Sequence, residues 1–325
     1  MNQYSPDRDI VVQLKNYSQV NGLRQMGYFA LNWAFIFLVA SLVHEYFSWP
    51  LYAIGIIFIA ARQHALAVLV HDGAHYRIAK NKKINDIISN IFGSYGCLMG
   101  THSYRVHHLN HHQYLNTDKD PDWARKIHLK EWAFPTSSSQ LSRVLLRQLW
   151  RGGYEWIKLT TMMFRQNVKL SSADQRRIEA QLLFVFWTFV FIAAFALNLT
   201  HQLMIYWFVP LLTIFPLIQR IRSISEHFAV ARDQILNRTR NVDPSFFEAF
   251  LLSPHSVNWH LVHHLYPAIP HFNLKKTQKL LAAESTYEEG QHLNGAYIFP
   301  FENSVLSDLV GRSQKRAVNA STEAA

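Results

Sequence analysis

The sequence predicts an all-α membrane protein with four transmembrane helices in two hairpins and a cytoplasmic helical cap that holds a di-metal site. Three observations predict this fold: four long uncharged runs come in two closely spaced pairs, basic residues avoid the turns within each pair, and histidines cluster beyond the runs. Hydrophobic residues make up 49% of the 325 residues and aromatic residues 14%, which excludes a disordered or fibrous chain. The single cysteine, Cys97, excludes an internal disulfide and an iron–sulfur site.

The first hairpin is predicted from residues 27–43 and 51–70. The first of these runs contains no charged residue, and a short polar turn at 44–50 separates it from the second. A helix of about 17–25 apolar residues crosses a bilayer. Because Arg62 interrupts the second run, that run qualifies as a transmembrane helix only if Arg62 faces protein or water rather than lipid.

The second hairpin is predicted from residues 182–199 and 203–218, neither of which contains a charged residue. The last run is a little short for a transmembrane helix. The connection Thr200-His201-Gln202 is so small that the chain must re-enter the membrane at once. Buried helices of a soluble protein are the alternative, but two hairpins with very short turns favour the membrane.

The distribution of basic residues predicts the orientation. The chain has 32 Lys and Arg against 22 Asp and Glu, and neither hairpin turn contains Lys or Arg. With four crossings, the N-terminus, the loop between the hairpins and the C-terminal part share one side, which the positive-inside rule makes cytoplasmic. The sequence has no nucleic-acid-binding motif, so the positive excess indicates anionic lipid headgroups.

Two further segments are predicted at the membrane surface. Residues 84–100 are moderately apolar, and we interpret them as interfacial or re-entrant, because a full crossing would put histidine clusters on opposite faces of the membrane. Residues 141–164 carry Arg143, Arg147 and Arg151 on one helical face, which is typical of a helix in the headgroup plane. The expected parts of the chain are a cytoplasmic N-terminal segment (1–26), a membrane domain (27–302) and a disordered tail (303–325).

Histidines form three clusters among the 18 in the chain. Residues three or four apart on a helix share a face, so each cluster can aim two or three imidazoles at one point. Eight clustered imidazoles exceed the four ligands of one zinc and predict two metals, although imidazole also binds copper, iron and nickel. The clustered residues are His71 and His75; His108, His111 and His112, preceded by His107; and His260, His263 and His264. Six other histidines are interpreted as ordinary polar residues, namely His44, His64, His128, His201, His271 and His292. His102 and His255 stay undecided, and the same interpretation is preferred for both.

A ninth ligand, His227, is predicted outside the clusters. His75 follows Leu51, where the second run begins, by the same number of positions as His227 follows Leu203, where the fourth begins. Both imidazoles should therefore stand about 36 Å above their helix starts, just beyond a hydrocarbon core of about 30 Å. Pro210 and Pro216 are expected to kink the fourth helix. The alternative is a surface histidine next to Glu226.

Metal-bound histidines usually donate their second N–H to a carboxylate or carbonyl. The acids in residues 118–122 are candidates for this role. The alternative is that these residues form a solvated turn around Pro121. Arg105 is expected to pair with one of the candidate acids or with an acidic group of a substrate. The candidate partners of the histidines are Asp72, Asp118, Asp120, Asp122, Glu226 and Asn258.

Three motifs together resemble the histidine boxes of the membrane fatty acid desaturase superfamily. They are HDGAH at 71–75, HHLNHH at 107–112, followed by Asn116 and Asp120-Pro121-Asp122, and NWHLVHHLYP at 258–267. The resemblance covers about residues 28–275 and includes the order, the separations and the four-crossing layout. It implies two non-haem irons that use O2 and two external electrons.

The resemblance implies an acyl-lipid desaturase as the first expectation. A hydroxylase or ketolase acting on a lipid, a carotenoid or a smaller metabolite is the alternative within the superfamily, because the boxes do not separate these enzymes. No cytochrome-b5-like segment is recognisable, so we expect a separate electron donor, ferredoxin or cytochrome b5 with its reductase. A histidine-rich metal transporter is disfavoured, because transporters bind near the membrane midplane and these clusters lie at helix ends and in loops.

Overall fold

The computed structural model describes residues 4–166 and 173–311. These residues form two compact units: 20–109 and 147–219 make the membrane unit, and 4–19, 110–146 and 220–311 make the polar unit. Helices dominate both units, and the strands in the described part of the chain are two segments of three residues each. The all-α prediction is therefore confirmed.

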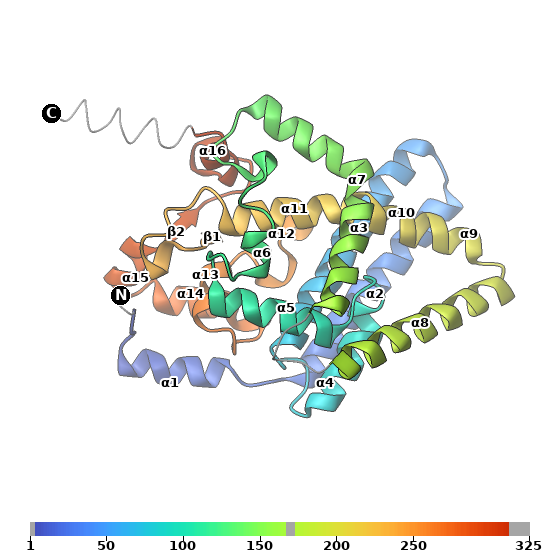
Figure 1. Ribbon diagram of the computed structural model, residues 1–325, viewed down its shortest axis with the longest axis horizontal. Coiled ribbons are helices and arrows are strands. Elements are labelled where there is room, and N and C mark those ends of the chain that lie inside the picture. Colours follow the sequence, from blue (N-terminus) through green and yellow to red (C-terminus); the bar gives the residue numbers. More distant parts are fainter. Residues whose placement is uncertain (1–3, 167–172, 312–325) are drawn as a thin grey trace. The chain divides into compact units, whose positions relative to one another are not determined.

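Within the described ranges, four helices are long and apolar enough to cross a membrane, which confirms the four predicted runs. Helices α2 and α3 pack along each other as the first hairpin (Figure 1). The four helical segments are Gly22–Glu45 (α2), Trp49–Ala74 (α3), Asp174–Ala196 (within α8, Ala173–Ala196) and Thr200–His227 (α9, η3, α10 and α11).

The fourth helical segment is irregular, as its two prolines predict. Its middle contains a π-helical turn, and Thr213 leaves the helical conformation with φ −120° and ψ −72°. Pro210 and Pro216 flank this break, because proline cannot donate an intrahelical hydrogen bond. Its parts are α9 (Thr200–Leu203), η3 (Met204–Phe208), α10 (Val209–Leu212) and α11 (Ile214–His227).

The two hairpin turns differ in how well the sequence predicts them. The first lies at residues 46–48, inside the predicted turn. The second prediction is wrong by a few residues, because Thr200-His201-Gln202 is the first turn of α9 and the connection is residues 197–199. Asn198 adopts a left-handed conformation with φ 56°, which ends α8 and turns the chain.

Arg62 faces protein rather than lipid, which is the condition under which residues 51–70 qualify as a transmembrane helix. It lies on α3, and only 8% of its surface is exposed, so the guanidinium faces protein. The guanidinium carbon lies 5.9 Å from the centre of the Phe35 ring on α2. A charged side chain in an apolar helix is tolerated when protein groups surround it.

The segment 84–100 does not form a spanning helix. It contains α4 (Lys82–Ser89) and one π-helical turn, η1 (Asn90–Ser94). Asn85 and Ser89 are buried, whereas Ile84 and Ile87 are half exposed on the other side. This division into two faces is that of a surface helix, and its membrane-interface position stays a prediction.

The polar unit is built from short helices and a small parallel sheet of two strands, β1 and β2, which are labelled in Figure 1. Asn241 of β1 pairs with Leu293 of β2 at the centre of that sheet. Helix α5 comprises Thr101–Tyr114, and helix α7 comprises Ser138–Arg165. The elements within the polar unit are α1 (Arg8–Tyr17), α6 (Pro121–Ala124), η2 (Lys130–Trp132), η4 (Ile235–Asn237), β1 (Arg240–Val242), α12 (Phe246–Leu252), η5 (Pro254–Ser256), α13 (His260–Leu265), α14 (His271–Leu281), α15 (Ser285–Gly290), β2 (His292–Asn294), η6 (Phe301–Asn303) and α16 (Val305–Leu309).

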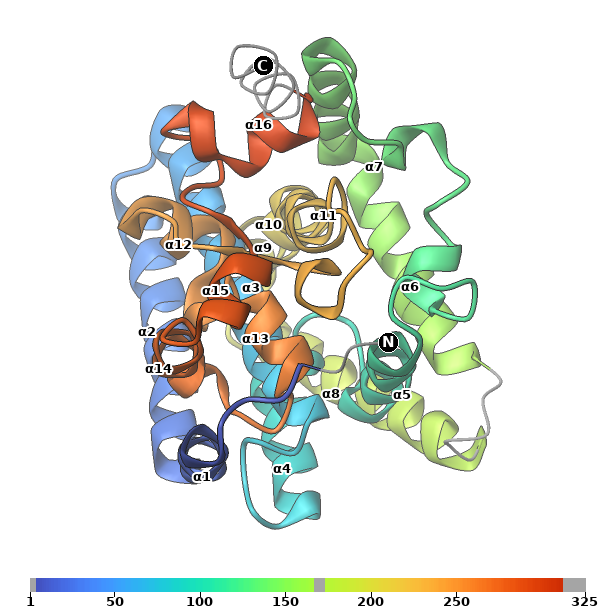
Figure 2. The same ribbon diagram turned by 90° about the vertical axis from the view of Figure 1, so that its left-hand side faces the viewer.

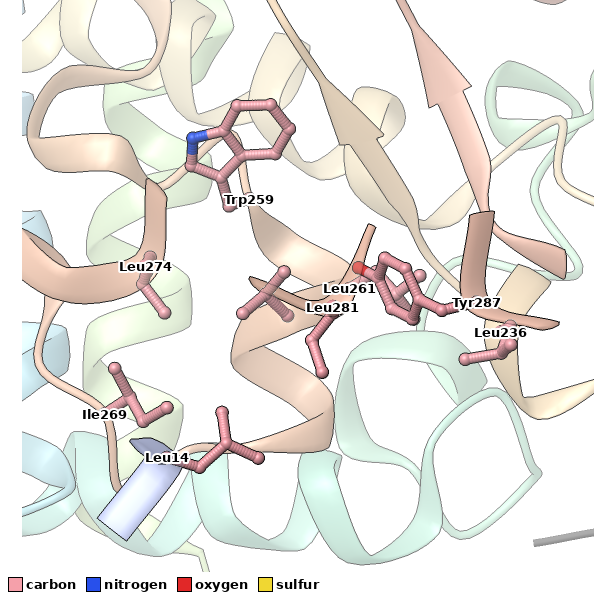
Figure 3. Packing of buried hydrophobic residues seen from close by; sticks show 9 residues of the cluster. Leu14, Leu236, Trp259, Leu261, Ile269, Leu274, Leu281 and Tyr287 are labelled. Atoms are coloured by element: carbon pink, nitrogen blue, oxygen red, sulfur yellow. The ribbon is translucent and has the colours of Figure 1, made fainter. Parts of the chain in front are cut away.

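Two hydrophobic clusters hold the polar unit together. In the first, Leu14 of α1 and Leu274 of α14 lie in the same cluster as Leu261 of α13 (Figure 3). The second gathers Trp132, Phe228 and aliphatic residues from the C-terminal part. The first cluster packs directly behind the third histidine motif, so burial of apolar surface fixes the position of α13.

The predicted disordered tail begins too early. Helix α16 lies inside the range 303–325, and its Val305 and Leu309 are buried in the cluster that contains Trp132 and Phe228. Two apolar residues four apart on one helical face supply the burial that orders this segment. Residues 312–325 lie outside the described part of the chain.

Candidate metal centre

Four histidines of the polar unit converge on one point. Each offers one ring nitrogen, and these four nitrogens all lie within 4.8 Å of one another. His111 comes from α5, His227 is the last residue of α11, and His260 and His264 lie one turn apart on α13. The fold thus brings four imidazoles from segments that are distant in the sequence to one point.

The donor set fits a metal ion. The Nε2 atom of His260 lies 2.9 Å from Nε2 of His227 and 3.0 Å from Nε2 of His264. One Nε2 has either one N–H or one lone pair, so it makes one good hydrogen bond and not two. Two ligand nitrogens about 2.1 Å from a shared metal, at a right angle, would be about 3 Å apart. A metal ion therefore explains this arrangement better than hydrogen bonds do.

Asp120 holds the ring of His111. Its two carboxylate oxygens lie 2.9 and 3.0 Å from Nδ1 of His111, and the pair is buried. A carboxylate accepts hydrogen bonds, so Nδ1 of His111 carries the proton and Nε2 keeps its lone pair for a metal. Glu226, the neighbour of His227 in the chain, has an oxygen 3.5 Å from Nδ1 of His260 and accepts a hydrogen bond from Arg222.

Helix α13 is fixed at its start by hydrogen bonds between asparagine side chains and the backbone. The side-chain oxygen of Asn241 on β1 accepts from the backbone N–H of Leu261 at 3.0 Å. Asn258 donates from its side chain to the carbonyl of Val242 at 2.8 Å. These two bonds tie the start of α13 and the residues just before it to β1, so this strand positions His260 and the two histidines after it.

A histidine pair lies beside this group. Nε2 of His112, on α5, is 2.9 Å from Nε2 of His263, on α13. The ring centres of His112 and His264 are 4.2 Å apart and nearly parallel. All of these residues belong to the polar unit.

The membrane unit carries a second convergence of histidines. His71 lies in the last turn of α3, His75 caps that helix, and His108 lies on α5. Nε2 of His75 and Nε2 of His108 are 2.9 Å apart, and the ring centres of His71 and His108 are 4.5 Å apart. The ring of Tyr104, one turn before His108, stacks on it with centres 5.3 Å apart.

Arg105 binds an acid that the sequence did not indicate. Its guanidinium pairs with Asp86 on α4, and the second contact of that pair is 3.1 Å long. The same guanidinium donates to the carbonyls of Gly73 and Ala74, both at 2.9 Å. The expected pairing with one of the candidate acids is wrong, because Asp86 of α4 lies against the end of α3 and is closer. Arg105 thus closes the C-terminus of the helix that carries His71.

Burial disfavours the protonated form of His264 in the polar unit and of His75 in the membrane unit. Burial lowers the pKa of His264 well below its usual range, and the neighbouring rings of His112 and His260 lower it further. Burial also lowers the pKa of His75 to about 3, with smaller contributions from Arg77 and Arg105. Neutral imidazole is the form that binds metals, so the lowered pKa values of His264 and His75 favour ligation by these two residues at neutral pH.

The remaining predicted partners contact other groups or solvent. Asp72 accepts a hydrogen bond from Gln25 at 2.8 Å, and Asp122 pairs with Arg125 at 3.0 Å. Asp118 is exposed, and Asn258 contacts backbone rather than a histidine. His107 is buried but belongs to neither group of converging histidines in the described chain.

The histidines interpreted as ordinary polar residues stay outside both groups among the residues that the structure places. His64 contacts Gln219 at 3.3 Å, and His292 pairs with Asp308 at 2.9 Å. The rings of His255 and His271 contact each other, with centres 4.9 Å apart.

Glu179 is a further positioning residue that sequence reasoning missed. It lies on α8, and its carboxylate accepts from the backbone N–H groups of His102 and Ser103 at 2.7 and 2.8 Å and from the Ser103 hydroxyl at 2.7 Å. Gly100 leaves room for it, since a Cβ at that position would overlap the carboxylate. Glu179 therefore caps the helix that carries His108.

The sequence is similar to those of known proteins. Residues 47–294 match the family described as fatty acid desaturase. The chain is 29% identical over 251 residues to dihydrorhizobitoxine desaturase of Bradyrhizobium elkanii, covering 74% of this chain and 70% of that protein. It is 24% identical to an endoplasmic reticulum acyl-lipid omega-3 desaturase (cytochrome b5) of Arabidopsis thaliana, with 74% of this chain and 66% of that protein covered. It is also 24% identical to a chloroplastic sn-2 acyl-lipid omega-3 desaturase (ferredoxin) of Helianthus annuus, covering 77% and 60% of the two chains.

Proposed function

Because the chain belongs to the fatty acid desaturase family, we propose that it is a membrane-bound di-iron oxidase that uses O2 to introduce a C=C bond into a fatty acyl lipid. The observation that carries this proposal is the convergence of His111, His227, His260 and His264, whose ring nitrogens lie within 4.8 Å of one another. All four ligands are neutral, which suits a metal that must stay electron-poor and reactive.

The nine histidines are assigned to two irons. The group of four holds one iron, with His227 as the ligand outside the three motifs. The other iron takes its ligands from His71, His75 and His108, which converge in the membrane unit, and from the remaining pair, His112 and His263.

Bound iron would supply an oxidant derived from O2 that is strong enough to remove hydrogen from an unactivated C–H bond. Desaturation takes one hydrogen atom from each of two adjacent carbons, and O2 accepts them with two electrons and two protons to give two waters. The protein's own part is to hold the imidazoles at fixed angles. Asp120 fixes the His111 ring, and the β1 contacts fix the helix of His260.

Desaturation of a lipid is supported by the names of the similar plant proteins, which act on acyl lipids. The similar bacterial protein is named for dihydrorhizobitoxine instead. Desaturation is common to all three names, so the bond that is formed is better supported than the substrate. This difference favours, as a second candidate, a desaturase or related oxidase acting on a smaller metabolite.

The electrons are proposed to come from a separate protein. The similar plant desaturases are named for cytochrome b5 in one case and for ferredoxin in the other. With the termini and all histidine motifs in the cytoplasm, a soluble or peripheral donor can reach the irons. The excess of Lys and Arg over Asp and Glu favours an acidic donor.

Lipid and metabolite profiling of a host with and without the gene tests the proposed reaction. We expect a product two hydrogens lighter than its precursor, and its mass identifies the substrate. A product one oxygen heavier would instead assign a hydroxylase. In vitro, NADPH alone should give no turnover, and addition of a reductase with ferredoxin or cytochrome b5 should start it. Turnover without a donor protein would overturn the proposed electron supply.

A further inference from the structure

We propose that the exposed face of α7 binds anionic phospholipids of the cytoplasmic leaflet. This inference concerns residues 147–165, which belong to the membrane unit and lie outside the histidine groups. Helix α7 is 28 residues long and can be followed in Figures 1 and 2. It is not among the four helices that are long and apolar enough to span the membrane within the described chain.

One face of α7 packs on the fourth membrane helix. A Cβ at Gly153 would lie 2.6 Å from the carbonyl oxygen of Leu212, and a Cβ at Gly152 would lie 2.8 Å from the side chain of Pro216. Two glycines are therefore needed for this close approach. Trp156 extends the contact, because its ring centre lies 4.8 Å from that of Phe215.

This contact fixes the depth of α7 in the bilayer. Leu212 and Pro216 lie on the helical segment that begins at Thr200. The orientation predicted from the basic residues makes Thr200 the outer end of this segment. At about 1.5 Å per residue they stand about 18 and 24 Å above that end. In a hydrocarbon core of about 30 Å they lie about 6–12 Å below the inner boundary. Interfacial helices bury their apolar face to about this depth.

A second face of α7, beside the packed one, presents large apolar side chains. Trp150 is 70% exposed and Tyr154 is 66% exposed, and both project from the same side one turn apart. Ile157 continues this stripe at 45% exposure. Trp and Tyr are the residues enriched where acyl chains meet headgroups. At the depth of α7, lipid is the occupant that this stripe fits.

Basic residues border the apolar stripe. Arg147, Arg151, Lys158 and Arg165 lie on this part of α7, against one acid, Glu155, which accepts a hydrogen bond from Gln148. Long basic side chains can extend from the boundary to the phosphates while their stems stay in the apolar layer. A net positive helix at this depth is complementary to anionic headgroups and not to zwitterionic ones.

Fluorescence quenching in nanodiscs tests the proposal. The purified full-length protein is placed in phosphatidylcholine nanodiscs with phosphatidylglycerol, and the acyl chains of one or the other lipid are brominated. The difference between wild type and Trp150→Phe isolates the signal of Trp150. We expect brominated phosphatidylglycerol to quench this signal several-fold more per mole than brominated phosphatidylcholine, with the preference falling as salt rises.

A variant with three basic residues of α7 neutralised tests whether their charge causes the preference for phosphatidylglycerol. In R147Q/R151Q/K158Q the preference for phosphatidylglycerol should be lost while quenching by both lipids remains. The matched control K275Q/K276Q/K279Q removes the same charge from exposed positions of α14 and should keep the preference. Equal quenching by the two lipids in the wild type would overturn the anionic selectivity. Absence of Trp150 quenching by either lipid would show that this face contacts protein or water, which overturns the proposal.

Discussion

Asp120 and His111 form a buried pair in which both carboxylate oxygens lie within 3.0 Å of the ring Nδ1. The same carboxylate accepts from the backbone N–H groups of Asp122 at 2.9 Å and Asn116 at 3.0 Å. It is therefore both the N-cap of α6 and the partner of a proposed iron ligand. Several hydrogen bonds fix the position of this carboxylate, and its bond to Nδ1 therefore fixes the orientation of the His111 ring.

Asp120→Asn should weaken iron binding without unfolding the protein. The amide keeps the size of the side chain and can still cap α6 with its oxygen, but it removes the charge that favours the Nδ1–H tautomer of His111. Loss of such a partner typically lowers metal affinity by about 10–100-fold. Competition with a chelator measures the affinity. Asp118→Asn is the control, because Asp118 is exposed; equal affinities in the two variants would contradict the proposed role.

His227→Ala should lose iron and activity while the protein stays in the membrane. The imidazole contributes one of the four nitrogens within 4.8 Å of one another, and the described chain places no further histidine in that group. His201→Ala is the matched control, because His201 is an exposed histidine at the other end of the same helical segment. Iron content and turnover are measured for both. A His227→Ala protein with full iron and normal turnover would remove His227 from the ligand set.

Glu179→Gln should destabilise the start of α5. The amide can accept from one of the two backbone N–H groups but leaves the other, at His102 or Ser103, unsatisfied in a buried place. An unsatisfied buried donor costs about 1–3 kcal/mol. The melting temperature in detergent measures the loss. Glu45→Gln, at an exposed position on α2, should melt with the wild type; a shared melting temperature for all three proteins would rule out the capping role.

The sequence predicted the elements that repeat a local pattern. The helical segments of Arg62 and His227 follow from apolar runs, and the histidine groups follow from spacings of three or four residues. Asp86 and Glu179 could not be predicted in this way. Their partners, Arg105 and Ser103, lie 19 and 76 residues away, and a single acid on a helix carries no periodic signal.

The sequence misplaces two boundaries, the second hairpin turn and the start of the C-terminal tail, because each depends on structure that the local sequence does not specify. The turn of the second hairpin depends on the left-handed conformation of Asn198, and several polar residues nearby are equally compatible with a turn. The order of α16 depends on the burial of Val305 and Leu309 against Trp132 and Phe228, which lie far away in the sequence. The local composition of the tail does not reveal these contacts, so it predicts disorder for the whole of residues 303–325.

Cysteine labelling tests the orientation of the helices. Burial raises the pKa of Cys97 to about 12, so the native thiol should not react with an impermeant maleimide in intact cells. Ser48→Cys, at the first hairpin turn, and Thr200→Cys, at the first residue of α9 directly after the second turn, should be labelled from outside. Lys119→Cys, at an exposed position after α5, should be labelled only after permeabilisation. Labelling of Lys119→Cys in intact cells would contradict a cytoplasmic position of the second histidine motif.

The central claim is that nine histidines hold two irons, and the metal content of the purified protein tests it most directly. Elemental analysis of protein reconstituted with iron under reducing conditions, together with protein quantification by amino-acid analysis, gives the metal per chain. We expect about two irons per chain, because the histidines exceed the ligands that one metal takes. A preparation that binds a single zinc and no iron would contradict it.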